Sequence, residues 1–281
     1  MIILSIIEFV KKARDLGINP ENYLREQFQK LILYVLVALG LSDFYVFQGG
    51  SALRIIYGSP RFSLDMDFTI IKRSVDSLMK DSERITRRLE LLMARDNITV
   101  EKRREKVIDG DLLRYFISFD TRGILGKKIK IKMELVIRKY VNVRFKRIIV
   151  TIDYPERLAF GVIVKTPEQI LADKLASLAG GMHRGYIRWR DIFDIYWIKT
   201  HLKADLDKEY FKQEFGSWIE RPEDLKALYT TLKNLLNSKN FGEFKRRLSL
   251  ILPSSLVSDD LLAEYVRTTL HVVEKALELV G

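Results

Sequence analysis

Two aspartates separated by one residue, Asp65 and Asp67, form the part of this sequence best suited to chemistry. They begin an apolar run that predicts a β-strand over 65–71, in which residues two apart project from the same face. Two neighbouring carboxylates repel each other unless a cation lies between them. Mg²⁺ prefers carboxylate and water oxygens and binds alongside substrate phosphates, so the pair predicts a metal site for phosphoryl chemistry. A solvated acidic strand edge is the alternative interpretation.

A glycine turn precedes this pair. The residues Gly49-Gly50-Ser51 follow an aromatic-rich segment, 43–48, that predicts a strand, and they begin a short helix expected over 51–57. Glycine lets backbone N–H groups approach a phosphate closely, and the first turn of a helix attracts anions. The Ser51 hydroxyl would either donate one more hydrogen bond or cap the helix. The turn therefore predicts a phosphate-binding loop.

Two longer segments carry a family resemblance. The sequence from Phe47 to Phe68 reads F-Q-G-G-S-A-L-R-I-I-Y-G-S-P-R-F-S-L-D-M-D-F and resembles the signature of the AbiEii/AbiGii-type nucleotidyltransferases, a branch of the polymerase-β-like superfamily. A second matching segment, 166–197, contains T-P-E-Q-I-L-A-D-K-L-A-S-L and then R-W-R-D-I-F-D-I-Y-W. Both occur in the family's order and separation, so the resemblance covers roughly 44–197. The helices after Lys199 carry no matching motif.

The resemblance implies roles for residues in the first segment. Phosphates of the nucleotide would be held by the loop residues Gly49, Gly50 and Ser51, and the catalytic metals by Asp65 and Asp67. The superfamily usually supplies a third carboxylate from a later strand, which positions or deprotonates the attacking hydroxyl. We favour Glu134, on the polar face of a strand predicted over 127–138, as catalytic residue and metal ligand. Asp120, at the end of the neighbouring predicted strand, is the rival.

The second segment implies further contacts with the nucleotide. Lys174 matches the family lysine that grips the triphosphate, and Asp191 matches a carboxylate near it. Asp194 follows on the same helical face, and either aspartate would pair with Lys174 or with Arg190, with Asp191 favoured. We predict Arg61 and Arg190 as additional nucleotide-binding residues. An exposed helical lysine is the alternative interpretation of Lys174.

The linker between the two helices of the second segment, 180–188, contains three glycines, two arginines and Tyr186, and Trp189 follows it. A flexible loop of this composition would contact RNA phosphates and stack a base, or would simply join the helices. His183 has no partner at metal-ligand spacing, which argues against a zinc site.

The pattern of elements predicts an α+β chain. Helix and strand alternate in the first half, period-two alternation runs from Ile98 to Asp153, and helices dominate after a short strand over 161–164. Together with the resemblance, this predicts a polymerase-β-like nucleotidyltransferase domain with a mixed sheet over 1–165. An α-helical domain over 166–281 would follow, with the reaction centre in the cleft between them.

Composition bounds the partners. The formal net charge of +11 favours a polyanion such as RNA, although solvated basic helices would give the same value. Cysteine is absent, which excludes disulfides and thiolate metal sites. The amino-terminal segment lacks the pattern of a signal peptide, and the longest apolar run, 31–41, is too short to cross a bilayer. We therefore expect a cytoplasmic protein without a membrane partner.

The resemblance implies the reaction. A bound Mg-NTP, with two Mg²⁺ ions, would be attacked at its α-phosphorus by an RNA hydroxyl, releasing pyrophosphate. Kinship suggests the 3′ end of a tRNA as acceptor and a toxin restrained by an antitoxin protein. A metal-dependent nuclease is one rival, but Val136 stands where its core would carry lysine. A non-catalytic module that binds RNA or a protein partner is the other.

Overall fold

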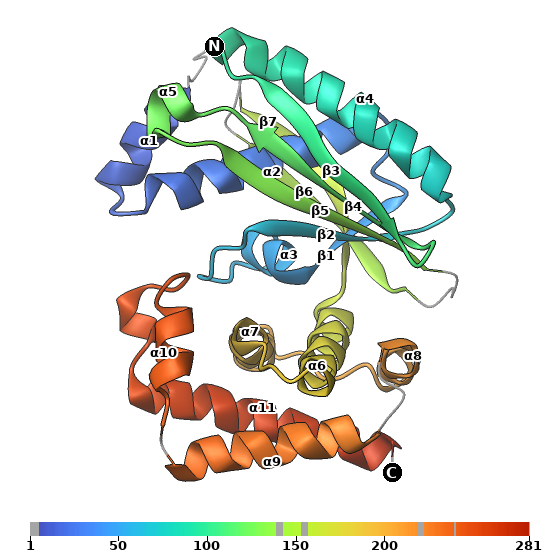
Figure 1. The fold of residues 1–281 in the computed structure, drawn as a ribbon, viewed down its shortest axis with the longest axis vertical. Coiled ribbons are helices and arrows are strands. Elements are labelled where there is room, and N and C mark those ends of the chain that lie inside the picture. Colours follow the sequence, from blue (N-terminus) through green and yellow to red (C-terminus); the bar gives the residue numbers. More distant parts are fainter. Residues whose placement is uncertain (1–5, 139–142, 153–156, 219–221, 239, 281) are drawn as a thin grey trace. The chain divides into compact units, whose positions relative to one another are not determined.

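The computed structural model describes residues 6–138, 143–152, 157–218, 222–238 and 240–280 (Figure 1). The chain divides into two compact units. The first, here called the sheet unit, comprises Met1–Gly58, Phe62–Val141 and Phe145–Val164. The second, the helical unit, comprises Ser59–Arg61, Asn142–Arg144 and Lys165–Gly281.

The sheet unit is built on a seven-stranded mixed sheet in the order β3-β4-β5-β2-β1-β7-β6. The strands are β1 (Tyr45–Gln48), β2 (Asp65–Ile70), β3 (Val100–Ile108), β4 (Leu112–Phe119), β5 (Ile129–Ile137), β6 (Phe145–Ile152) and β7 (Leu158–Lys165). Strand β2 runs antiparallel to β1 and parallel to β5, while β3, β4 and β5 form antiparallel neighbours. The predicted mixed sheet is confirmed.

Alternation of side chains fixes which face of the sheet is buried. On β5 the side chains of Ile129, Ile131, Met133 and Leu135 are fully buried, whereas the residues between them are partly exposed or exposed. Two helices, α2 (Pro20–Ala38) and α4 (Val75–Met93), pack on this apolar face. The rings of Phe28 on α2 and Phe119 on β4 stack with centroids 4.0 Å apart in the core. The remaining helices of the unit are α1 (Ile6–Asp15), α3 (Gly49–Ile55) and the single turn α5 (Arg122–Leu125).

The helical unit consists mainly of six helices. They are α6 (Pro167–His183), α7 (Trp189–Thr200), α8 (Lys208–Trp218), α9 (Pro222–Ser238), α10 (Gly242–Leu248) and α11 (Asp259–Val280). Helix α6 packs between α7 and α8, and α11 lies along α9 and contacts α7 (Figure 1). None of the helices in the described ranges has the length and apolar character needed to span a membrane.

Most predicted elements are present, and the main differences are these. Helix α1 and the single turn α5 were not predicted, and β3 was predicted only as part of a region of period-two alternation. The prediction that 180–188 forms a loop is wrong for its first residues, because α6 continues to His183. Glycine weakens a helix, but a Cβ on Gly181 would lie 2.8 Å from the Tyr186 carbonyl oxygen. Gly181 therefore allows the chain to fold back tightly against the end of the helix.

Replacing Phe28 with alanine tests the core beneath the sheet. Loss of the buried ring and its stack on Phe119 is expected to lower the free energy of unfolding by about 3–5 kcal/mol. Urea denaturation followed by circular dichroism measures this change. The control is Ile7→Ala on α1, where the side chain is 67% exposed and the expected change is within about 0.5 kcal/mol. Equal stabilities of the two variants would contradict this packing.

Candidate active site

Asp65 and Asp67 project from the polar face of β2. Met66 lies between the two aspartates in the sequence and Phe68 follows them; both are fully buried on the opposite face. Both aspartates are partly exposed. In the parallel pairing of β2 with β5, Asp65 lies beside Lys132 and Asp67 beside Glu134. Residues in register on adjacent strands share a face, so the pairing brings three carboxylates and one ammonium together.

Lys132 compensates the repulsion within this acidic group. Its Nζ lies 2.9 Å from Oδ2 of Asp65 and 3.5 Å from Oε1 of Glu134. Partial burial of the ammonium lowers its pKa, but the charges of Asp65, Glu134 and Asp67 outweigh that effect and raise the pKa of Lys132. Arg114 on β4 adds a second cation, since its Nε lies 2.6 Å from Oε1 of Glu134. Two basic side chains therefore partly neutralise the three carboxylates of this face.

Gly49 leaves room for the carboxylate of Asp67. Its φ is +75°, in the left-handed region that favours glycine. A Cβ at this position would lie 2.3 Å from Oδ2 of Asp67. This distance is too short for a Cβ contact, so the carboxylate or the backbone would have to move. The Asp67 carboxylate consequently lies against the backbone where β1 ends and α3 begins. This close approach requires glycine at position 49.

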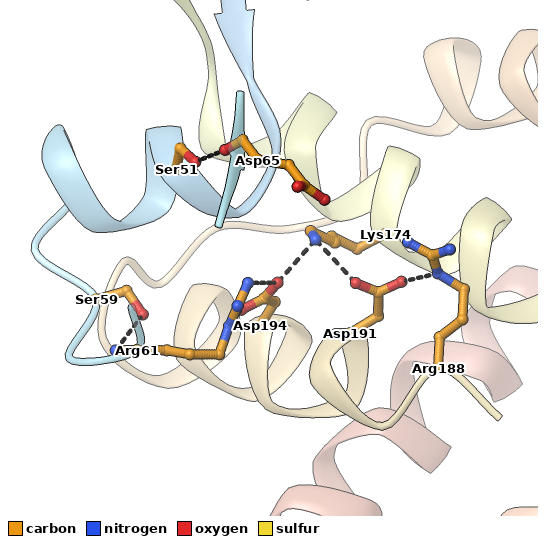
Figure 2. A network of polar contacts seen from close by, with 8 residues as sticks. All are labelled: Ser51, Ser59, Arg61, Asp65, Lys174, Arg188, Asp191 and Asp194. Atoms are coloured by element: carbon orange, nitrogen blue, oxygen red, sulfur yellow. Dashed lines mark hydrogen bonds and ion pairs between the residues drawn. The ribbon is translucent and has the colours of Figure 1, made fainter. Parts of the chain in front are cut away.

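The Ser51 side chain forms a hydrogen bond within the protein. It is fully buried, and its hydroxyl donates to the backbone carbonyl oxygen of Asp65 (Figure 2). Gln29 of α2, also buried, donates from Nε2 to the Ser63 carbonyl oxygen at 3.0 Å. These bonds fix the start of β2 against α3. A phosphate contact of the predicted loop would thus come from backbone N–H groups, which lack intrahelical acceptors in the first turn of a helix.

The rival third carboxylate lies elsewhere. Asp120 follows the end of β4, and β5 separates β4 from β2. Asp120 pairs with Arg122: Nη2 of Arg122 lies 2.7 Å from Oδ2 of Asp120. This bond holds the pKa of Asp120 well below its usual range. Glu134, in contrast, is the direct neighbour of Asp67.

The residues present are suited to a magnesium ion that arrives with a nucleotide. Within the described ranges, no three histidine, aspartate or glutamate side chains converge as a ready-made metal site. Mg²⁺ commonly uses one or two protein carboxylates and completes its shell with phosphate and water oxygens. Asp65 and Asp67 offer this all-oxygen donor set, and the Lys132 ammonium shows that a cation is accommodated beside Asp65.

A buried network of ion pairs links α6 and α7 in the helical unit. The ammonium of Lys174 lies 2.8 Å from Oδ1 of Asp191 and 2.7 Å from Oδ2 of Asp194 (Figure 2). Arg61 donates from Nε and Nη2 to the two oxygens of Asp194, each at 2.7 Å. The Arg188 side chain contacts the other oxygen of Asp191. Three cations and two carboxylates thus form one chain of contacts.

Burial makes these charges dependent on one another. Asp194 is fully buried, and Arg61 and Asp191 are 3% and 2% exposed. Burial raises the pKa of both carboxyl groups, but Lys174 with Arg188 lowers that of Asp191, and Arg61 with Lys174 lowers that of Asp194. The basic neighbours outweigh burial, so the pKa values of both aspartates lie below their usual range. Burial likewise lowers the pKa of Lys174, yet its two carboxylates raise it, so the amine stays protonated.

The remaining predicted residues fall into different surroundings. Arg61 forms hydrogen bonds with Asp194. Arg190 is exposed on α7, and the arginine that pairs with Asp191 is Arg188. Asp191 was favoured as the partner of Lys174, and in the structure Lys174 contacts both Asp191 and Asp194. Their proposed contacts with a nucleotide stay predictions.

Two features of the linker after α6 modify the predicted RNA contact. The ring of Trp189 stacks on Phe244 of α10, with centroids 5.2 Å apart, and is therefore part of the packing. Tyr186 is 45% exposed and receives a hydrogen bond from Nε of Arg184 at 3.2 Å. Tyr186 and Arg184 thus lie together at the surface of the linker.

Sequence reasoning missed three residues that shape these sites: Lys132, Gln29 and Arg188. Lys132 is two residues before Glu134 in an alternating strand, which places both on one face, but its partner Asp65 depends on strand register. Arg188 is three residues before Asp191, a spacing that favours pairing on a helix. No local signal identifies Gln29, because its acceptors come from distant segments.

Comparisons with known proteins agree with this architecture. The family model described as nucleotidyl transferase AbiEii toxin, type IV toxin–antitoxin system, matches residues 31–267. The crystal structure of JHP933 from Helicobacter pylori is similar with a TM-score of 0.54 and 18% identity, covering 92% of this chain and 94% of that one. MenT4, a nucleotidyltransferase toxin from Mycobacterium tuberculosis, gives a TM-score of 0.55 and 14% identity over 96% of this chain and 90% of its own. A search of curated proteins gives no significant match.

The substitution Gly49→Ala tests the close approach of Asp67. The matched control is Gly58→Ala, because Gly58 has a similar φ of +72° but open space where a Cβ would lie. Both variants acquire backbone strain of about 1–3 kcal/mol. Only Gly49→Ala displaces the Asp67 carboxylate, which is expected to cost about 1–3 kcal/mol more in the free energy of unfolding. Equal losses in urea denaturation would show that the carboxylate does not lie against Gly49.

The substitution Asp194→Asn tests the buried network. Uncompensated charges on Arg61 and Lys174 are expected to lower the free energy of unfolding at neutral pH by about 3–5 kcal/mol. Because folding lowers the pKa of Asp194, the network stabilises the protein above the unfolded-state pKa of about 3.9 and loses this contribution as pH falls further. The variant should therefore show a smaller decline in stability below about pH 4.

The control for this measurement is Asp205→Asn. Asp205 pairs with Lys199 but its side chain is 79% exposed, so water and salt screen the interaction. Its removal is expected to change the free energy of unfolding by less than about 1 kcal/mol. A neutral effect of Asp194→Asn would contradict the buried ion pairs.

Proposed function

Since the chain belongs to the AbiEii family of nucleotidyltransferase toxins, we propose that it transfers a nucleotidyl group from an NTP to an RNA hydroxyl. The acceptor hydroxyl attacks the α-phosphorus, a P–O bond forms to the acceptor, and pyrophosphate leaves. We propose the arrangement of the polymerase-β-like superfamily for the catalytic part of the chain.

The observation that carries this proposal is the register of β2 against β5. It gives Asp67 a direct acidic neighbour in Glu134, and it makes Asp65 and Asp67 project on the same face. Adjacent strands of a sheet hold such a group more rigidly than loops do. The assigned role of Glu134 is to position the acceptor hydroxyl and accept its proton.

Asp65 and Asp67 are the proposed ligands of two Mg²⁺ ions, with Glu134 as an additional ligand. Bound Mg²⁺ would neutralise charge on the triphosphate and on the leaving pyrophosphate. Lys132 then has a role of its own: it offsets the repulsion between the carboxylates and holds them close together before the nucleotide binds.

Phosphate binding is assigned to the start of α3 and to Lys174. The left-handed conformation of Gly49 and the place of these residues in the first turn of α3 support contacts from the backbone N–H groups of Gly49, Gly50 and Ser51 to phosphate oxygens. Lys174 would stabilise the leaving phosphates, with Asp191 holding its ammonium in place at 2.8 Å. Arg61 acts by orienting Asp194 through its paired hydrogen bonds.

The proposed acceptor is the 3′ end of a tRNA. The net charge of +11 supports a polyanionic partner, because neutralised phosphates release counterions. Membership of the AbiEii toxin family supports action as a toxin. An antitoxin protein is the proposed partner of the chain, in keeping with the family's description.

Transfer of label from each α-³²P NTP into total RNA in the presence of Mg²⁺ tests the reaction. The substitutions Asp67→Asn and Glu134→Gln are expected to reduce transfer by at least about a hundredfold, since each removes a charge that acts at the reacting atoms. The control is Asp120→Asn, which alters the rival carboxylate and should leave transfer nearly unchanged.

The outcomes separate the hypotheses. Label in one RNA class, lost in the Asp67 and Glu134 variants, supports the assignment and names the base and the acceptor. A loss in Asp120→Asn with full activity in Glu134→Gln would move the third carboxylate to Asp120. Absence of transfer into RNA by the wild-type chain would reject RNA as the acceptor.

A further inference from the structure

A phenylalanine lies in the middle of the polar face of the sheet. On β4 the side chains of Leu113, Tyr115 and Ile117 are fully buried on the helix-covered face, so Phe116 between them projects to the opposite face. It is partly exposed there, in a position that a soluble sheet would ordinarily give to a polar residue. Neither core packing nor the chemistry assigned to Asp65 and Asp67 explains this ring.

Basic side chains surround Phe116 on both neighbouring strands. Its direct partners in register are Arg103 on β3 and Lys132 on β5. On this face, strands β3 to β5 carry five cations and two carboxylates, namely Arg103, Lys106, Arg114, Lys130 and Lys132 against Glu101 and Glu134. Lys130 is exposed, and within the described ranges its ammonium has no ion-pair partner. Arg103 pairs with Glu101 at 2.6 Å, but cations outnumber carboxylates on this face by five to two, so the surroundings of the ring favour an anionic ligand.

The same face leads directly to the acidic pair. Phe116 lies beside Lys132, and Lys132 lies beside Asp65 on the next strand. Adjacent strands are roughly 4.8 Å apart, so the ring lies about 10 Å from the β2 carboxylates across the sheet. A short stretch of single-stranded nucleic acid spans this distance. An aromatic ring flanked by cations on an open sheet is the arrangement on which bases stack while phosphates meet the basic side chains.

We infer that Phe116, with Arg103 and Lys130, forms a subsite that binds a base and its phosphate near the 3′ end of the acceptor RNA. This inference rests on the proposed function and adds to it how the acceptor strand is held. The ring stacks on a base close to the terminal hydroxyl, and the two cations contact the backbone. Since every base offers a flat face, the subsite holds the strand without selecting its sequence.

The test measures binding and transfer with a short single-stranded RNA that has a free 3′ hydroxyl. Phe116→Ala and Phe116→Leu should weaken binding in fluorescence anisotropy, and raise KM for this RNA, by about tenfold or more. The KM for the NTP should stay unchanged, since the nucleotide contacts proposed above do not include Phe116. Phe116→Tyr retains a flat ring and should restore binding, which separates stacking from a general effect on folding.

The matched control is Phe145→Ala. Phe145 is 47% exposed and is also followed by basic residues, Lys146 and Arg147, but it lies on β6 at the other edge of the sheet. Its substitution should leave RNA binding and transfer unchanged. A loss equal to that of Phe116→Ala would show that any exposed ring has the effect, and would overturn the inference.

Failure of the inference and failure of the proposed function give different results. Transfer by the wild-type chain with the same RNA affinity in Phe116→Ala and Phe116→Leu overturns the stacking subsite and leaves the reaction intact. Binding that depends on the ring, without transfer from any NTP, keeps the subsite and rejects the reaction. A wild-type chain that binds duplex RNA or a protein but no single strand overturns the subsite.

Discussion

Mutual repulsion among carboxylates is the constraint on which the sheet unit depends. The register of β2 and β5 places Asp65, Asp67 and Glu134 together on one polar face, where like charges oppose folding. Lys132 offsets this repulsion at 2.9 Å from Asp65, and Arg114 does so at 2.6 Å from Glu134. A set of carboxylates that needs cations to be stable is suited to bind a divalent ion. The same property thus limits stability and supports the proposed chemistry.

The glycine turn solves a steric problem that this arrangement creates. Asp67 lies so close to the backbone at position 49 that a Cβ there would displace its carboxylate. Ser51 and Gln29 then hold the neighbouring backbone through buried hydrogen bonds to the start of β2. Rigid support of this kind lets a site keep its geometry before its ligand arrives, so that less binding energy is spent on ordering it.

Charge balance governs the helical unit as well. Lys174, Asp191 and Asp194 are buried, and each would be costly to bury alone. Arg61 and Arg188 complete the pairing, so that each charge of this network has an oppositely charged neighbour. One consequence is that Lys174 stays protonated although it is shielded from water. An ammonium held in this way is suited to a role in phosphate binding, because its charge is maintained in a dry environment.

The sequence alone determined the main elements, the family and the strand faces on which Asp65, Asp67 and Glu134 lie. Period-two alternation predicted β5 and the face that carries Glu134, and the spacing of Asp65 and Asp67 placed both on one face, because these are local properties of a strand. Tertiary structure decided which residues become neighbours. The choice of Lys132 as the partner of Asp65, the pairing of Arg61 with Asp194 and the burial of Ser51 all depend on contacts between segments far apart in the chain. In the sequence, nothing distinguishes Phe116 from the other apolar residues of its strand. Its basic neighbours follow from the register of three strands. Local periodicity fixes the direction of a side chain, whereas strand order and register, which depend on the packing of the whole core, fix what it meets.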